Sequence, residues 1–251
     1  MIKDFFKGIH YPFSAIRFIV NHPSLGKFIV IPFTINVILF LSGLIFFINN
    51  IDSLLQAIPK SDAWYFAVLY YFLAVLLVAS FLILTFYTFT IIGNIIASPF
   101  NSALSEKTEE LRFNSRTNKP FYLKIIIRDA YRAIMTEFKR LFLFICIFIP
   151  IFILNFIPVI GQAAYFALML VFTAWGLSFT FMDYAMERKT ASFRRKLQIV
   201  SSRKSLTLGF GLMCFLFGLI PIFNLFLIPV CVTAGTLIYF NEFESPKPSG
   251  V

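Results

Sequence analysis

The chain has few of the residues that catalytic and metal sites need. His10 and His22 are its only histidines and both lie near the N-terminus, so no close His pair or Cys/His cluster exists for metal or triad chemistry. Neither a G-x-S-x-G elbow nor a phosphate-binding P-loop occurs. We therefore expect no enzyme, no metal and no cofactor.

Cysteine is also scarce, and the N-terminus lacks the features of a cleaved signal peptide. Cys146, Cys214 and Cys231 lie inside apolar segments, and their odd number gives no disulfide framework. They are expected to be buried packing residues. Residues 1–7 lack a compact apolar core and a small-residue cleavage site, so no signal peptide is predicted.

Charge is absent from three long runs, residues 63–105, 141–182 and 205–241. Each run is far longer than the roughly 20 apolar residues that cross a bilayer as a helix. The hydrophobic share of 59% also exceeds that of an average soluble domain. The sequence thus predicts an all-α integral membrane protein. Without an ionisable residue inside these runs, a midplane carboxylate for proton coupling is not expected. Asp183, just after the second run, is either a pathway carboxylate or a boundary residue.

Positive charge is concentrated between the apolar runs. Of the 22 Lys and Arg, all but Lys60 and Lys247 lie in residues 3–27, 107–140 and 188–204. Basic residues that flank membrane spans collect on the cytoplasmic side, so these three segments should share that face, with both termini cytoplasmic. The net charge of +10 is therefore read as an orientation signal, and nucleic acid is not an expected partner. Basic helices here could instead contact lipid headgroups.

These patterns divide a single membrane domain, residues 1–251, into seven segments. The predicted order is an interfacial N-terminal segment 1–27, two long spans in 28–105, a cytoplasmic helical region 106–140, a hairpin 141–182, a basic cytoplasmic link 183–204, a second hairpin 205–241 and a tail 242–251. Pro12 and Pro23 bracket the first segment. Gly93, Asn94 and the Ser98-Pro99 pair mark the expected cytoplasmic exit of the 63–105 run, because proline ends or kinks a helix.

The last two runs each read as a helical hairpin broken by proline. The first is broken at Pro150 and at residues 157–162, and the second at residues 220–224 and at Pro229. The arms of roughly 20 residues or fewer allow either full crossing or partial penetration. Backbone groups at broken helix ends inside a bilayer need protein or water as partners. The tips are therefore candidate pathway or interface positions: Pro158, Gly161, Gln162, Pro221 and Asn224.

The best candidate for anion binding is the segment from His22 to Phe28, directly before the first span. A helix N-terminus offers unpaired N–H groups and partial positive charge, and Lys27 adds a full charge. Sulfate would fit this chemistry. A lysine at a membrane boundary and a proline at a helix start are also common without any ligand.

Several short motifs, taken together, resemble the CysZ sulfate-permease family and the etoposide-induced membrane proteins related to it. The motifs are Ala97-Ser98-Pro99-Phe100-Asn101 with Leu104 and Glu106, Pro158-Val159-Ile160-Gly161-Gln162, Asp183-Tyr184, Phe210-Gly211, and Pro221 with Asn224. Their order and spacing hold over most of the chain, from about Pro23 to Thr236.

The resemblance implies a bacterial inner-membrane protein that admits sulfate for cysteine biosynthesis. It also implies a homo-oligomer, with a hexamer as one candidate, in which long spans combine with partly penetrating hairpins. The family's sulfate site falls on Ser24, Leu25, Gly26 and Lys27, where Gly26 and Lys27 occupy the positions of two arginines. Backbone N–H groups of Leu25 and Gly26, with Lys27, would form the site.

A second function stays open beside the permease. A membrane scaffold or regulator that transports nothing would use the basic cytoplasmic helices to bind lipid or another protein. Glycine and lysine at the two arginine positions support this alternative, because lysine lacks the planar guanidinium that binds an oxyanion through two parallel hydrogen bonds.

Overall fold

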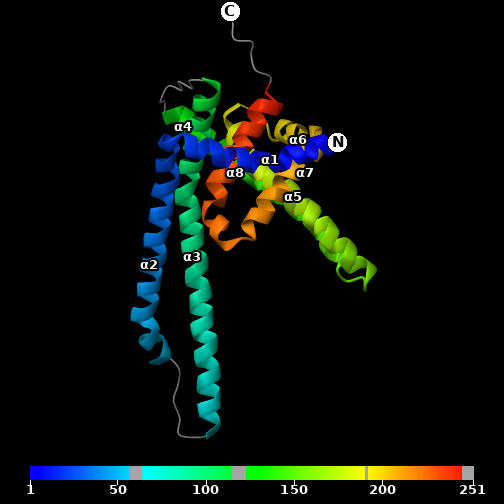
Figure 1. Ribbon diagram of the computed structural model, residues 1–251. Coiled ribbons are helices and arrows are strands. Elements are labelled where there is room, and N and C mark those ends of the chain that lie inside the picture. The colour runs from blue at the N-terminus through cyan, green and yellow to red at the C-terminus, as the bar shows by residue number, and fades with distance from the viewer. Residues whose placement is uncertain (57–63, 115–122, 190–191, 245–251) are drawn as a thin grey trace, which may run out of the picture. The chain divides into compact units, whose positions relative to one another are not determined.

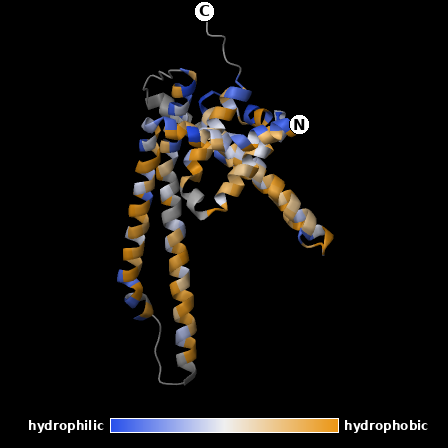
Figure 2. Ribbon diagram, in the orientation of Figure 1, coloured by the Kyte–Doolittle hydropathy of each residue, from blue (hydrophilic) through white to orange (hydrophobic). Residues whose placement is uncertain are grey.

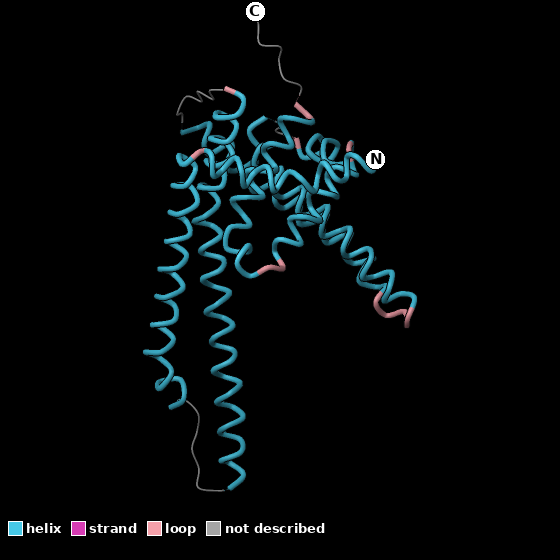
Figure 3. Tube along the Cα trace, viewed as in Figure 1, coloured by secondary structure: helices cyan, strands magenta, loops and turns pink. Residues whose placement is uncertain are grey.

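The computed structural model describes residues 1–56, 64–114, 123–189 and 192–244. Within those ranges the chain is helical apart from short turns and contains no strand (Figures 1 and 3). The elements are α1 (Ile2–Asn21), the 3-10 turn η1 (Pro23–Leu25), α2 (Gly26–Gln56), α3 (Trp64–Phe113), α4 (Leu123–Leu154), α5 (Ile160–Lys189), α6 (Phe193–Ser202), α7 (Lys204–Gly218) and α8 (Pro221–Glu242).

Three described stretches are long and apolar enough to cross a membrane. They are Pro23–Ser53, Val68–Thr88 and Ile160–Lys189, with mean hydropathies of 2.4, 2.5 and 1.6. A fourth arises if α6 and α7, which meet at a bend of 93°, count as one broken span. Figure 2 shows the apolar colouring along most of α2. The prediction of an all-α membrane protein is confirmed.

The chain forms two compact units, and the smaller one covers Lys27–Phe100. It contains most of α2 and the N-terminal part of α3. Phe81 packs against Phe46 and Phe47, with ring centroids 6.2 and 5.6 Å apart. Away from these ring contacts the helices expose large apolar side chains; Val68 and Val75, for example, are 67% and 70% exposed. Such surfaces suit a lipid environment, because in water they would be an aggregation liability.

The other unit comprises Met1–Gly26 and Asn101–Val251. Its helix α1 lies directly on α7 because two glycines remove the side chains at the crossing. A Cβ at Gly8 would stand 2.1 Å from the carbonyl oxygen of Leu206, and one at Gly209 would stand 2.2 Å from that of Phe5. Small residues that let backbones approach this closely are typical of helix packing in membranes.

The core of this unit lies among α5, α7 and α8. Phe179 and Met182 of α5 and Phe210 of α7 are fully buried, and nearly all of α8 from Val230 to Phe240 is buried. Burying a large apolar side chain contributes roughly 1.5–3 kcal/mol relative to exposure in water. Aromatic contacts extend the core, including Trp175 with Phe179 at 6.0 Å between ring centroids.

Proline ends fewer helices than the sequence predicts. Pro12, Pro99, Pro150 and Pro229 all lie inside helices, and α3 continues beyond Pro99 to Phe113. The breaks expected at Pro150 and Pro229 are therefore wrong, and the membrane exit expected near Pro99 coincides with no helix end. A proline removes one backbone hydrogen bond at a cost of about 3 kcal/mol, and membrane helices tolerate this where neighbouring groups satisfy the freed carbonyl.

Both predicted hairpins are present as helix–turn–helix units. Residues 155–159 join α4 to α5, and Leu219 and Ile220 join α7 to α8. Helix α4 runs without a break through residue 141, where the sequence predicts that the cytoplasmic region passes into the hairpin; that segment boundary stays a prediction. Asn114, which directly follows α3, has a left-handed φ of 52°.

Candidate functional site

The predicted anion site sits where the 3-10 turn η1 runs into α2. Ser24 and Lys27 are exposed, Gly26 is half-buried, and the Leu25 side chain is fully buried, at 0% exposure. The ammonium group of Lys27 lies 5.0 Å from the centroid of the Phe28 ring. Leu25 therefore anchors the turn, while the serine hydroxyl and the lysine ammonium remain accessible.

Two of the expected anion donors are already engaged inside this turn. The N–H of Leu25 donates to the carbonyl oxygen of His22 at 3.0 Å, and the N–H of Gly26 donates to that of Pro23. These bonds arise because a 3-10 turn satisfies groups that a helix start would otherwise leave free. An anion would have to share the two N–H groups or open the turn. The Ser24 hydroxyl and the Lys27 ammonium belong to exposed residues and are further donors at the site.

The tip of the first hairpin is exposed and apolar. Pro158 and Gln162 are exposed, and Val159, at 79% exposure, adopts a left-handed φ of 62° that turns the chain. Gly161 is buried because α5 starts against the end of α4, where an added Cβ would lie 2.2 Å from the carbonyl oxygen of Leu154. Gly161 is thus required for the turn, and Asn155 and Gln162 are exposed polar side chains at this tip.

The second hairpin turns at Ile220, directly before the predicted Pro221. Pro221 occupies the first helical position of α8, where its missing N–H costs nothing, and Asn224 lies in the first turn. The side chains of both lie outside the described part of the chain. Figure 3 draws the two hairpin turns as separate loops, and the structure does not bring the two sets of tip residues together.

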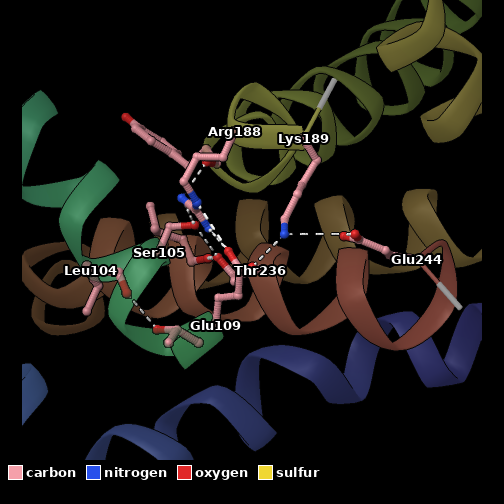
Figure 4. Close-up of polar contacts among 10 residues, drawn as sticks. Leu104, Ser105, Glu109, Arg188, Lys189, Thr236 and Glu244 are labelled. Atoms are coloured by element: carbon pink, nitrogen blue, oxygen red, sulfur yellow. Dashed lines mark hydrogen bonds and ion pairs between the residues drawn. The ribbon is translucent and has the colours of Figure 1, made fainter. Parts of the chain in front are cut away.

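A buried ion-pair network, which the sequence did not single out, joins α3, α5 and α8. Glu109 is fully buried; its Oε2 accepts from Nη2 and Nε of Arg188 at 3.0 and 3.2 Å, and its Oε1 lies 2.9 Å from Nζ of Lys189. Arg188 also donates to Oγ of Ser105 at 3.0 Å, and Ser105 is 2.7 Å from the Thr236 hydroxyl (Figure 4). Each buried charge has a partner, as burial requires.

A second cluster ties α6 to α5. Lys196 of α6 is fully buried, with its ammonium 2.8 Å from Asp183 and in contact with Glu187. Arg140 of α4 lies 3.9 Å from the same Asp183. Asp183 therefore belongs to an ion-pair cluster, which favours its reading as a boundary residue over that of a lone pathway carboxylate.

A third cluster connects the N-terminal helix to the end of α8. Glu242 accepts from the Tyr11 hydroxyl and pairs with Lys7, both at 2.7 Å, and also binds Arg203, which lies 2.7 Å from Asp4. Burial raises the pKa of the Glu242 carboxyl, but hydrogen bonds from Lys7, Tyr11 and Arg203 outweigh burial and hold the pKa below its usual value. Burial and the adjacent carboxylate both raise the pKa of Tyr11.

One sequence signal could have indicated the first of these clusters. Asn101, Ser105 and Thr108 recur at helical spacing and are all buried, so they form a polar stripe on the face of α3 that includes Glu109. A stripe of small polar residues beside a carboxylate indicates a helix face that contacts other polar groups. The partners, however, come from residues 79 and more positions later in the chain.

Several helices long and apolar enough to span a membrane, two helical hairpins and charged clusters near helix ends define a polytopic helical membrane protein. The family described as sulfate transporter CysZ/etoposide-induced protein 2.4 matches residues 11–229. The chain belongs to this family.

Curated relatives agree with that assignment. The sulfate transporter CysZ of Vibrio atlanticus is 30% identical over 241 residues, covering 94% of this chain and 93% of the relative. The protein of the same name from Vibrio parahaemolyticus is 29% identical, covering 96% of both chains. A third, from Pseudomonas syringae pv. tomato, is 30% identical and covers 94% of this chain and 92% of its own.

Proposed function

We propose that this protein is a sulfate permease of the bacterial inner membrane that supplies sulfate for cysteine biosynthesis. The observation that carries the proposal is similarity, at 30% identity over more than nine-tenths of both chains, to a protein named as a sulfate transporter. Three apolar stretches long enough to span the membrane supply the scaffold that a permease needs.

Sulfate or a related oxyanion is recognised at the start of α2, by Ser24, Leu25, Gly26 and Lys27. The partial positive charge at the N-terminus of this 31-residue helix and the exposed Lys27 attract the anion. The Ser24 hydroxyl is an accessible donor, and the N–H groups of Leu25 and Gly26 are shared with their carbonyl partners in the turn.

The pathway and topology follow from charge. The three apolar runs hold no ionisable residue, so passage does not use a midplane proton carrier. Pro158, Gly161, Gln162, Pro221 and Asn224 at the hairpin tips shape the path or a homo-oligomer interface. The basic segments and both termini face the cytoplasm, as the positive-inside rule requires. The seven segments, from residues 1–27 to residues 242–251, together form one membrane domain.

Growth of a bacterium that lacks sulfate uptake, on limiting sulfate, tests the proposal. The wild-type chain should restore growth, and Lys27→Ala should restore it poorly at low sulfate, because the variant removes the full charge at the site. Lys204→Ala is the matched control, since Lys204 is also exposed at a helix start but lies outside the site. No rescue by wild-type protein that is shown to reach the membrane contradicts the proposal.

A second candidate is a membrane scaffold that transports nothing. The engaged N–H groups of Leu25 and Gly26, together with lysine at an arginine position, favour it because they leave few free donors for sulfate. This candidate predicts that a stoichiometric protein or lipid partner is recovered with the purified protein and that sulfate uptake by cells is unchanged by Lys27→Ala.

A further inference from the structure

A pocket of about 450 Å³ lies against α1 in the larger unit, and none of the residues assigned to sulfate lines it. Its walls come from one face of α1, from the end of α3 and from the end of α8. The polar groups that line it include Lys7, Ser14, Arg17, Asn21, Arg112 and Asn241. Side chains from three helices therefore converge on one cavity in which cations predominate.

The cations of this pocket are not all neutralised within the protein. Lys7 forms an ion pair with Glu242 at 2.7 Å, so the carboxylate neutralises the charge of this lysine. Arg17 and Arg112, by contrast, are exposed and form no ion pair with any part of the chain that the structure describes. Two guanidinium groups that face one polar pocket without a carboxylate partner suit a tetrahedral oxyanion, because each presents a planar fork of donors.

The same helix carries an apolar stripe beside the pocket. Ile2, Phe6, Phe13 and Val20 recur at spacings of four and seven residues and are exposed, with Ile2 at 75% and Val20 at 72%. The third face of α1, with Gly8 and Ala15, is buried in the protein. A helix with an exposed apolar stripe beside a basic face lies in the bilayer interface, where the stripe enters the acyl boundary and the basic face meets the headgroups.

We propose that this pocket binds the phosphate group of an anionic lipid headgroup, with Arg17 and Arg112 as the charged ligands and Asn21 as a neutral donor. Ser14 lines the same pocket, and its hydroxyl donates to the carbonyl oxygen of His10 at 3.3 Å. The shared chemistry is a tetrahedral oxyanion, which a free phosphate or sulfate ion also has. The apolar stripe selects the lipid, because only a lipid occupies the pocket and the adjoining acyl layer together. The inference does not rest on sulfate transport, and each can fail without the other.

Native mass spectrometry of the full chain, purified in detergent and supplied with phosphatidylglycerol and phosphatidylcholine, tests the proposal. The wild type should retain phosphatidylglycerol in preference. The double variant Arg17→Gln/Arg112→Gln should bind it roughly 30-fold more weakly, since each cation near anionic lipid contributes about a factor of five. The matched control is Arg194→Gln/Arg195→Gln, which removes two exposed arginines of α6 that do not line the pocket.

A second variant and a second ligand complete the design. Ser14→Phe fills the pocket without removing charge and should also weaken phosphatidylglycerol binding while the thermal unfolding midpoint stays at the wild-type value. Calorimetry with inorganic phosphate or sulfate on lipid-depleted protein should give no binding that depends on Arg17 and Arg112. The proposal is overturned if both arginine pairs affect lipid retention equally, if Ser14→Phe and the double variant retain lipid as the wild type does, or if the pocket binds the free ions and not the lipid.

Discussion

Gly26 offers the sharpest test of how the anion site works. Its φ of −56° and ψ of −37° are ordinary helical values, and a Cβ placed there meets no heavy atom within 4 Å. Gly26→Arg should therefore fold without strain and restore one guanidinium to the site. A hydrogen bond to a charged group contributes about 1.5–3 kcal/mol, and solvent exposure lowers this to about 1 kcal/mol here. We expect sulfate affinity to rise about fivefold.

Calorimetric titration of purified protein with sulfate, and with chloride for comparison, measures this gain. Gly26→Gln is the control, because glutamine is long and polar but uncharged. If Gly26→Arg binds sulfate no better than wild type, or if Gly26→Gln gains as much, the start of α2 does not recognise sulfate through charge and the assigned site is refuted.

Three further predictions concern stability, measured by thermal unfolding in detergent. Gly209→Leu should destabilise by more than about 4 kcal/mol through its clash with the α1 backbone, while Gly218→Ala, whose added Cβ meets only a side-chain atom at 3.4 Å, should be nearly neutral. Glu109→Gln should cost about 3–5 kcal/mol by leaving two cations without a buried counter-ion, whereas Glu110→Gln, which breaks a partly exposed pair, should cost under about 1 kcal/mol. Because the folded pKa of Glu242 is lowered, its ionised form stabilises the protein above the ordinary glutamate pKa of 4.5 and the contribution disappears as pH falls through the folded pKa. The stability advantage of wild type over Glu242→Gln should thus hold at neutral pH and shrink below pH 4.5; a constant difference would contradict the assigned pKa shift.

The membrane architecture could be predicted because lipid imposes a simple rule on sequence. Long uncharged runs must become helices, and the runs at 63–105, 141–182 and 205–241 indeed hold parts of α3, the α4–α5 hairpin and the α7–α8 hairpin. The helix breaks predicted at Pro150 and Pro229 are wrong, because the local cost of one lost hydrogen bond is smaller than what the surrounding helix gains from burial and from its other hydrogen bonds.

The charged clusters could not be predicted in the same way. Glu109 meets Arg188 from 79 positions away, and Arg203 meets Asp4 from 199 positions away. Nothing in a local pattern specifies such partners, so the sequence assigns Glu109, Arg188 and Arg203 only to cytoplasmic segments and Asp4 only to the interfacial N-terminal segment. The residues of the predicted anion site, in contrast, could be named from the sequence. The 3-10 turn that engages the N–H groups of Leu25 and Gly26 could not, because it depends on backbone geometry.

Uptake of radiolabelled sulfate into proteoliposomes that contain only the purified, correctly inserted protein tests the central claim most directly. The account predicts flux above that of empty vesicles, saturation with sulfate, and a lower rate at limiting sulfate for Lys27→Ala. Flux equal to that of empty vesicles would contradict it and leave a membrane protein of this family that acts through a partner.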